Sequence, residues 1–290
     1  MNFMLTAVIA LGAIALVAAV VLFVVSKKFA VKEDPRIGQV QEALPGANCG
    51  GCGFAGCSGM AAALVAGADK GSLSGLNCPV GGQAVMEKVS GLLGMAIAQS
   101  EPRVAVVRCS GSCGIRPRIA EYDGLRSCAA INVAGAGETG CGYGCLGCGD
   151  CVSACQFGGI RLNDETGLPE INEDLCTACG ACASYCPRHI IELRKKGLKN
   201  RRVFVSCVNQ DKGAISRKAC QVSCIGCGKC QTACKFEAIT ITNNLSYIDD
   251  SKCRLCTKCV EVCPTHAIMK VHFPLRKPIV MKSEEEEVRA

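Results

Sequence analysis

The sequence predicts an α+β protein with one N-terminal membrane-spanning helix, a small cysteine-rich domain and two related cysteine-rich modules. Three observations support this fold class. The segment 3–25 is apolar and uncharged, cysteine accounts for 26 of the 290 residues, and one cysteine spacing occurs four times in two close pairs. The chain has no tryptophan and only 4% aromatic residues. We therefore expect bound metal to supply stability that a small apolar core cannot.

The first 28 residues are assigned to a transmembrane anchor, 1–28. Its uncharged stretch of 23 residues would span about 35 Å as a helix, which is enough to cross a bilayer. Lys27, Lys28 and Lys32 follow it, so the positive-inside rule predicts a single-pass protein of the inner (cytoplasmic) membrane, with its N-terminus outside and its cluster domains in the cytoplasm. A cleaved signal peptide, the alternative, needs a charged start and a shorter apolar stretch. The span holds no ionisable residue and offers no ion path by itself.

The segment 29–95 is predicted to be a small metal-binding domain. Asp34-Pro35 is typical of a helix start, a second helix is expected from Cys57 to Ala66, and 67–94 shows mainly small residues and turns. Its four cysteines form one candidate [4Fe-4S] site: Cys49, Cys52, Cys57 and Cys78. Zinc is the competing metal, because four thiolates also suit it. The glycine-rich loop and the other cysteine motifs of the chain favour the cluster.

The repeated spacing is Cys-x2-Cys-x2-Cys-x3-Cys, which is the run found in bacterial ferredoxins. In two-cluster ferredoxins the fourth cysteine of each run binds the cluster of the other run. Four interleaved ligand sets follow: Cys145, Cys148, Cys151 and Cys186; Cys176, Cys179, Cys182 and Cys155; Cys224, Cys227, Cys230 and Cys263; Cys253, Cys256, Cys259 and Cys234.

An internal repeat relates the two modules. An apolar strand, 104–107, leads into Cys109, and a similar strand leads into Cys207; Cys141 and Cys220 each stand four residues before the first cysteine of a run. The first module is expected at 102–194 and the second at 203–275, joined by a basic linker at 195–202. A disordered tail is expected at 276–290, where four consecutive glutamates occur. The linker residues Lys195, Lys196, Lys199, Arg201 and Arg202 either dock an acidic electron carrier or form a solvated connection.

Six cysteines remain outside these sets. Four of them make a candidate sixth site: Cys109, Cys113, Cys128 and Cys141. Cys207 and Cys220 are interpreted as buried thiols, since a pair is too small for such a cluster. The prediction is six [4Fe-4S] clusters, or five if this additional set binds none.

Composition and motifs exclude several functions. Disulfides are disfavoured in a reducing cytoplasm. The formal charge is +7, but six clusters would add about −12, so the basic composition does not indicate nucleic-acid binding. His189 and His266 follow complete thiolate sets and are expected to be surface or packing residues. No nucleotide-binding glycine motif and no nucleophilic catalytic set is present.

The anchor, the segment Leu44-Pro45-Gly46-x2-Cys49-Gly-Gly-Cys52-Gly-Phe-Ala-Gly-Cys57 and the paired runs together resemble the B subunit of the Rnf complex, an ion-translocating ferredoxin:NAD oxidoreductase of bacterial membranes. The resemblance covers nearly the whole chain and is most specific in the anchor and the Cys49–Cys57 loop. A second pair of runs, at 224–263, and the additional cysteines between 109 and 141 correspond to an extended polyferredoxin form.

The resemblance implies an electron carrier that accepts electrons from soluble ferredoxin and passes them to other membrane subunits of a translocase. The alternatives are the iron–sulfur subunit of another membrane oxidoreductase or hydrogenase, and a cluster-based redox sensor. A sensor needs only one cluster, so a chain with many favours a role as an electron wire.

Replacing Lys27, Lys28 and Lys32 with glutamate should weaken cytoplasmic retention of the soluble part, because those charges set the orientation of the span. Protease digestion from the outside of intact cells would report the change. Digestion of the cysteine-rich part in the wild-type chain would contradict the predicted topology.

Overall fold

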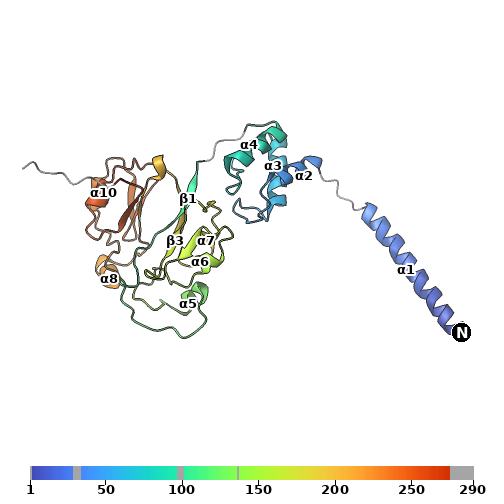
Figure 1. Ribbon diagram of the computed structural model, residues 1–290, viewed down its shortest axis with the longest axis horizontal. Helices are drawn as coiled ribbons and strands as arrows, with labels where there is room; N and C mark the ends of the chain where they lie inside the picture. The colour runs from blue at the N-terminus through green and yellow to red at the C-terminus, as the bar shows by residue number, and fades with distance from the viewer. Residues whose placement is uncertain (1, 29–33, 97–100, 136, 275–290) are drawn as a thin grey trace, which may run out of the picture.

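The computed structural model describes residues 2–28, 34–96, 101–135 and 137–274 (Figure 1). A single helix is followed by a three-helix domain and by two modules of short strands and helices, so the α+β prediction is confirmed. Lys32 and the predicted tail 276–290, with Glu284–Glu287, lie outside the described residues.

The N-terminal helix α1 (Asn2–Lys28) is long and apolar enough to cross a membrane. Its large apolar side chains from Leu5 to Val25 are exposed, and it extends away from the other elements in Figure 1. A helix that is apolar on every side and packs on no other element has no partner for its surface among the described residues, and such a surface is suited to a bilayer.

The second part contains three helices: α2 (Pro35–Ala43), α3 (Cys57–Asp69) and α4 (Gly82–Leu93). They pack around Val40, Met60, Leu64, Met86 and Val89. The predicted start of α2 is confirmed, because Asp34 Oδ1 accepts the Arg36 backbone N–H at 2.8 Å and Pro35 is the first helical residue. This capping pattern satisfies donors that a helix start otherwise leaves unpaired.

Helix α4 differs from the sequence-based expectation, which places turns at 67–94. Its sequence is rich in small residues, but Met86 and Val89 stand three positions apart and are both fully buried against α2 and α3. Burial of this short apolar stripe outweighs the weak local helix propensity. Helix α3 also ends later than expected, at Asp69 rather than Ala66.

The first and last strands of the first module pair with each other in antiparallel orientation. Strand β1 (Arg103–Val107) pairs with β4 (Ile191–Lys195), with Ala105 opposite Leu193. Between them a hairpin joins β2 (Ile160–Leu162) and β3 (Pro169–Ile171). Three short helices carry cysteines or flank them: α5 (Cys128–Ala134), α6 (Asp150–Ser153) and α7 (Ala181–Ser184).

The second module repeats this topology. Strand β5 (Arg202–Val205) pairs with β8 (Ile268–Val271), and β6 (Ile239–Thr242) pairs with β7 (Leu245–Ile248). Its helices are α8 (Gly213–Ala219), α9 (Lys229–Ala233) and α10 (Lys258–Glu261). The predicted strands before Cys109 and Cys207 are therefore present, and each is the first strand of its module.

The two modules contact each other through buried charged residues. The short 3-10 helix η1 (Leu198–Asn200) connects them. Arg194 Nη1 donates to Ile248 O at 2.7 Å, and Arg202 forms an ion pair with Glu173. Arg194 and Arg202 are only 2% and 4% exposed. Both are strand residues of the module interface, and Arg202, which was expected in the basic linker, is thus not solvated.

Candidate metal centres

The four cysteines of the three-helix domain line one cavity: Cys49, Cys52, Cys57 and Cys78. The Asn48 side chain fixes the loop, since its Oδ1 accepts the Cys57 backbone N–H at 2.8 Å where α3 begins. Cys78 Sγ accepts the Gly81 backbone N–H at 3.3 Å. Burial raises the pKa of Cys78. Leu44, Pro45 and Met60 contribute apolar walls.

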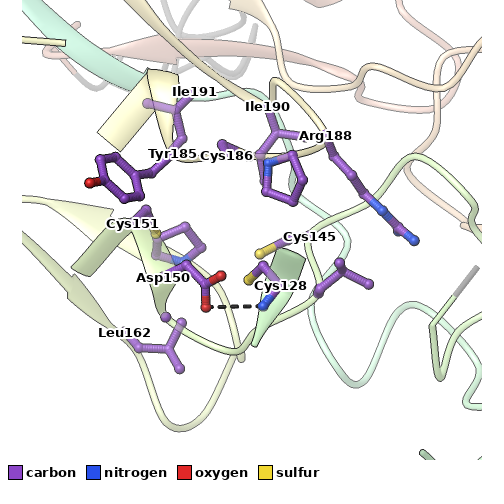
Figure 2. A pocket seen from close by; sticks show the side chains of 14 residues that line it. Cys128, Cys145, Asp150, Cys151, Leu162, Tyr185, Cys186, Arg188, Ile190 and Ile191 are labelled. Carbon is purple, nitrogen blue, oxygen red and sulfur yellow. Dashed lines mark hydrogen bonds between the residues drawn. The ribbon is translucent and has the colours of Figure 1, made fainter. Parts of the chain in front are cut away.

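A second cavity lies in the first module and is shown in Figure 2. Three cysteines of the first predicted ferredoxin set line it, namely Cys145, Cys151 and Cys186. The fourth cysteine on its wall is Cys128, from the first turn of α5. Asp150 holds that turn in place, because its carboxylate accepts the backbone N–H of Cys128 at 3.0 Å.

Cys148, the fourth member predicted from the spacing, lies beside Cys128. The two thiols interact directly, and burial followed by the proximity of Cys128 raises the pKa of Cys148 to about 11. Cys148 Sγ faces the Leu146 carbonyl oxygen at 3.7 Å. Five thiols therefore lie at or beside this cavity, one more than a [4Fe-4S] cluster would bind.

Two further cavities bring together complete predicted sets. One is lined by Cys155, Cys176, Cys179 and Cys182. The other is lined by Cys224, Cys227, Cys230 and Cys263. In both, the isolated cysteine comes from the partner run, as interleaving requires.

The last set belongs to the second module. Cys253 has Cys256 and Cys234 as neighbours, and Cys259 has Cys253 and Cys256. Burial raises the pKa of Cys259 to about 12. Cys234, Cys253 and Cys259 pack with the apolar residues of the second module, whereas Cys256 is exposed.

The residues at these five places fit [4Fe-4S] clusters. Each place offers four thiols, and the cavity walls are mainly apolar. Among the described residues no three His, Cys, Asp or Glu side chains converge on one metal ion. Burial also raises the pKa of Cys145 and Cys182 to about 12, so these thiols would have to lose their protons to hold a cluster.

One loop of the N-terminal domain touches the first module. A Cβ atom built on Gly51 would lie 2.5 Å from the Cys179 carbonyl oxygen. The backbones of two ligand loops therefore meet where a larger side chain has no room. This contact sets the N-terminal site next to the site of Cys155 and Cys176–Cys182.

Three members of the predicted additional set lie around Cys145, and the fourth lies apart. Cys109 and Cys128 are both neighbours of Cys145, and Arg188 has Cys128 and Cys141 as neighbours. Cys113 is exposed, and its Sγ lies against Gly167. Cys128 lines the cavity of Figure 2, and Cys109 and Cys141 also lie at the interface between the modules, with Cys220 as a common neighbour.

The sequence did not reveal the polar residues that position these cysteines. Asp150 lies inside a ferredoxin run, and its place between two cysteines was the available signal. Arg116 and Arg108 are 5% and 8% exposed. Each donates to a carbonyl oxygen of a cysteine: Arg116 to Cys145 at 2.8 Å and Arg108 to Cys207 at 3.3 Å. Such contacts join distant segments, so no local pattern marks them.

Comparison with known families supports the metal assignment. A family described as "Putative Fe-S cluster" matches residues 44–72, and one described as "4Fe-4S dicluster domain" matches residues 144–190 and 223–267. The first covers the Cys49–Cys57 loop, and the second covers both pairs of runs.

Similar proteins cover nearly the whole chain. The chain is 42% identical over 268 residues to the B subunit of the Na(+)-translocating ferredoxin:NAD(+) oxidoreductase complex of Acetobacterium woodii, covering 92% of this chain and 78% of that protein. It is 39% identical over 265 residues to the B subunit of the ion-translocating oxidoreductase complex of Methanosarcina acetivorans, covering 91% and 97%. It is 41% identical over 273 residues to the proton-translocating counterpart of Clostridium ljungdahlii, covering 93% and 94%.

The chain belongs to the family of B subunits of these ion-translocating oxidoreductase complexes. The resemblance inferred from the sequence is confirmed, and so is the iron–sulfur electron-transfer role. The chain carries 4Fe-4S domains and is one component of a multi-subunit assembly. Ligation by each individual cysteine stays a prediction.

At the cavity of Figure 2, either Cys128 or Cys148 should complete the ligand set when the other is removed. We expect Cys148→Ala and Cys128→Ala each to keep full iron content, because a second thiol is already adjacent. The double variant should lose about four iron atoms per chain. Iron analysis of anaerobically reconstituted protein measures this; a loss of about four in Cys148→Ala alone would show that Cys148 is indispensable.

Proposed function

We propose that this chain is a membrane-anchored electron carrier that accepts electrons from reduced soluble ferredoxin. It passes them through its clusters to membrane subunits that translocate ions and reduce NAD elsewhere in the complex. The related proteins of Acetobacterium woodii and Clostridium ljungdahlii have names that state this overall reaction. Each [4Fe-4S] cluster would supply one-electron chemistry, and the protein supplies position, burial and docking surfaces.

The contact between Gly51 and Cys179 is the main observation that supports this order of redox centres. It brings the N-terminal site against the first ferredoxin module. The same site begins about 20 residues beyond α1, so a short tether holds it near the membrane. The N-terminal site is therefore suited to be the last centre before the membrane partners.

A cationic cavity at the junction of the two modules suits the arrival of electrons. It has a volume of about 190 Å³ and includes Cys253 in its wall. Of its positive side chains, Arg194, Lys195 and Arg202 form ion pairs with Glu192, Glu101 and Glu173, so Lys196 and Arg201 supply the excess positive charge, with Asp250 as a further acidic lining residue. An excess of positive charge beside a cluster ligand favours an acidic redox carrier such as ferredoxin, both in approach and in orientation.

The anchor supports the proposed location. With its N-terminus outside, α1 would leave both ferredoxin modules in the cytoplasm, where soluble ferredoxin is found and where thiols stay reduced. The span has no ionisable residue, so ion movement is assigned to other subunits.

Replacing Cys52 with alanine tests the proposed route. Ferredoxin should still reduce the clusters of the two modules, but ferredoxin-dependent NAD reduction in membranes should be lost, because the last centre is missing. The control is Ser58→Ala, an exposed position in the same region. Near-normal NAD reduction in Cys52→Ala, with loss of that cluster verified by EPR, would show that the site is structural and lies off the route.

Charge reversal tests the docking surface. The double variant Lys196→Glu and Arg201→Glu should lower the association rate with reduced ferredoxin by about tenfold at low ionic strength, since steering by opposite charge is weakened. Stopped-flow reduction at several salt concentrations measures this. Lys70→Glu, on the exposed end of α3, makes the same kind of charge change away from the cavity. An equal effect of both variants would argue against a specific dock.

A further inference from the structure

Four cysteines at the junction of the two modules occupy equivalent positions in the internal repeat. Cys109 follows β1 and Cys207 follows β5, in each case two residues after the strand ends. Cys141 and Cys220 each stand four residues before a ferredoxin run. The repeat therefore supplies two matching pairs, one from each module.

Asn209 connects one pair to the other. It is 1% exposed. Its backbone N–H donates to Cys207 Sγ, and its side-chain Nδ2 donates to Cys141 Sγ, both at 3.5 Å. A single buried residue thus contacts sulfur atoms from both modules.

The strand ends that carry Cys109 and Cys207 are also joined. Arg108 Nε donates to Val205 O at 3.2 Å, and its Nη2 donates to Cys207 O at 3.3 Å. Ser110 Oγ and Ser206 Oγ lie 2.5 Å apart. The residues on both sides of Cys109 therefore contact the segment that contains Cys207.

The thiols themselves form one neighbourhood. Cys220 interacts electrostatically with Cys109 and Cys141, and Cys207 interacts with Cys109. Cys141, Cys207 and Cys220 are 4%, 9% and 6% exposed. Burial raises the pKa of Cys207 to about 12. Four thiols from distant parts of the chain thus meet in an interior region.

Two positively charged side chains lie beside this group, Arg116 buried and Arg188 half-buried. Arg116 is 5% exposed and lies near Cys220; it donates to Cys145 O and Thr139 Oγ1, and its buried Nε has no hydrogen-bond partner among the described residues. Arg188 Nη1 donates to Cys141 O at 3.2 Å. Burying a guanidinium among neutral groups is costly. A thiolate-bound iron–sulfur cluster, which is anionic, would compensate this charge.

We propose that Cys109, Cys141, Cys207 and Cys220 bind a sixth [4Fe-4S] cluster, shared between the two modules. This set differs from the one expected from the spacing, because the structure places Cys113 at the surface and Cys128 in the cavity of Figure 2. Cys207 and Cys220 then act as ligands from the second module and not as packing thiols.

The position of this site suits electron transfer between the two modules. Cys207 also neighbours Cys224, a ligand position of the second module, and Cys109 also neighbours Cys145, a ligand position of the first. The shared site therefore lies between a cluster site of each module. It provides a one-electron centre for transfer between them; this role rests on the proposed function, in which reduced ferredoxin is the source of electrons.

Two cysteine variants distinguish the proposed set from the set predicted by spacing. The full chain with its anchor is reconstituted anaerobically in detergent, and iron and sulfide are counted per chain. The wild type should hold about 24 iron atoms, Cys220→Ala about 20, and the matched control Cys113→Ala about 24. The iron count does not depend on ferredoxin or NAD turnover. The proposed ligand set can therefore be wrong while the proposed function is correct.

The opposite pattern, in which Cys113→Ala loses about four iron atoms and Cys220→Ala keeps its full content, would overturn the proposal. Equal content in the two variants would overturn it as well. Cys207→Ala serves as a second variant if Cys220→Ala does not accumulate, and it should also hold about 20 iron atoms. EPR spin counting on the reduced protein should show one fewer paramagnetic centre in each variant that loses iron.

Discussion

The gathering of cysteine side chains inside each module is the constraint on which the rest of the structure depends. In the described residues each module has two-stranded sheets and helices of four to seven residues, and such pieces are marginal in isolation. The apolar clusters inside the modules combine cysteines with isoleucines, valines and alanines; four of the ten buried residues of one cluster and two of the six of the other are cysteine. Without metal these cysteines are small, weakly packed side chains. With metal they crosslink segments far apart in the chain, so folding and cluster loading become one process.

A second constraint is the burial of arginine where the modules meet. Arg194 lies over the rings of Phe204 and Tyr247, at 6.0 and 5.0 Å from their centres, and pairs with Glu192. Arg202 pairs with Glu173, which also accepts a hydrogen bond from His272. Burial alone would raise the pKa of Glu173, but the hydrogen bonds from Arg202 and His272 outweigh it and lower the pKa. Such buried ion pairs fix the relative position of the two modules more than they stabilise the fold, because the cost of desolvating the charges offsets much of their attraction.

The sequence was sufficient for features that are set by short-range spacing. The ferredoxin runs, the interleaving of their fourth cysteines and the loop from Cys49 to Cys57 are all local patterns with a fixed geometry. Helix α4 could not be predicted, because its stability comes from burying Met86 and Val89 against other helices. The places of Cys109, Cys128 and Cys220 depend on how distant segments dock. Spacing alone grouped Cys128 with its sequence neighbours. In the structure, a hydrogen bond from its backbone N–H to Asp150 holds Cys128 at the cavity of Figure 2.

The close approach of Gly51 to Cys179 affects the rate of electron transfer rather than the stability of the fold. Electron tunnelling between redox centres slows exponentially as their edges move apart, so a shift of a few tenths of an ångström changes the transfer rate. At Gly51 no side chain separates the two ligand loops, and the protein surfaces meet backbone to backbone. A single missing methyl group thus helps to set the distance over which an electron leaves the ferredoxin modules. The turnover of a large membrane assembly can depend on an atom that this residue lacks.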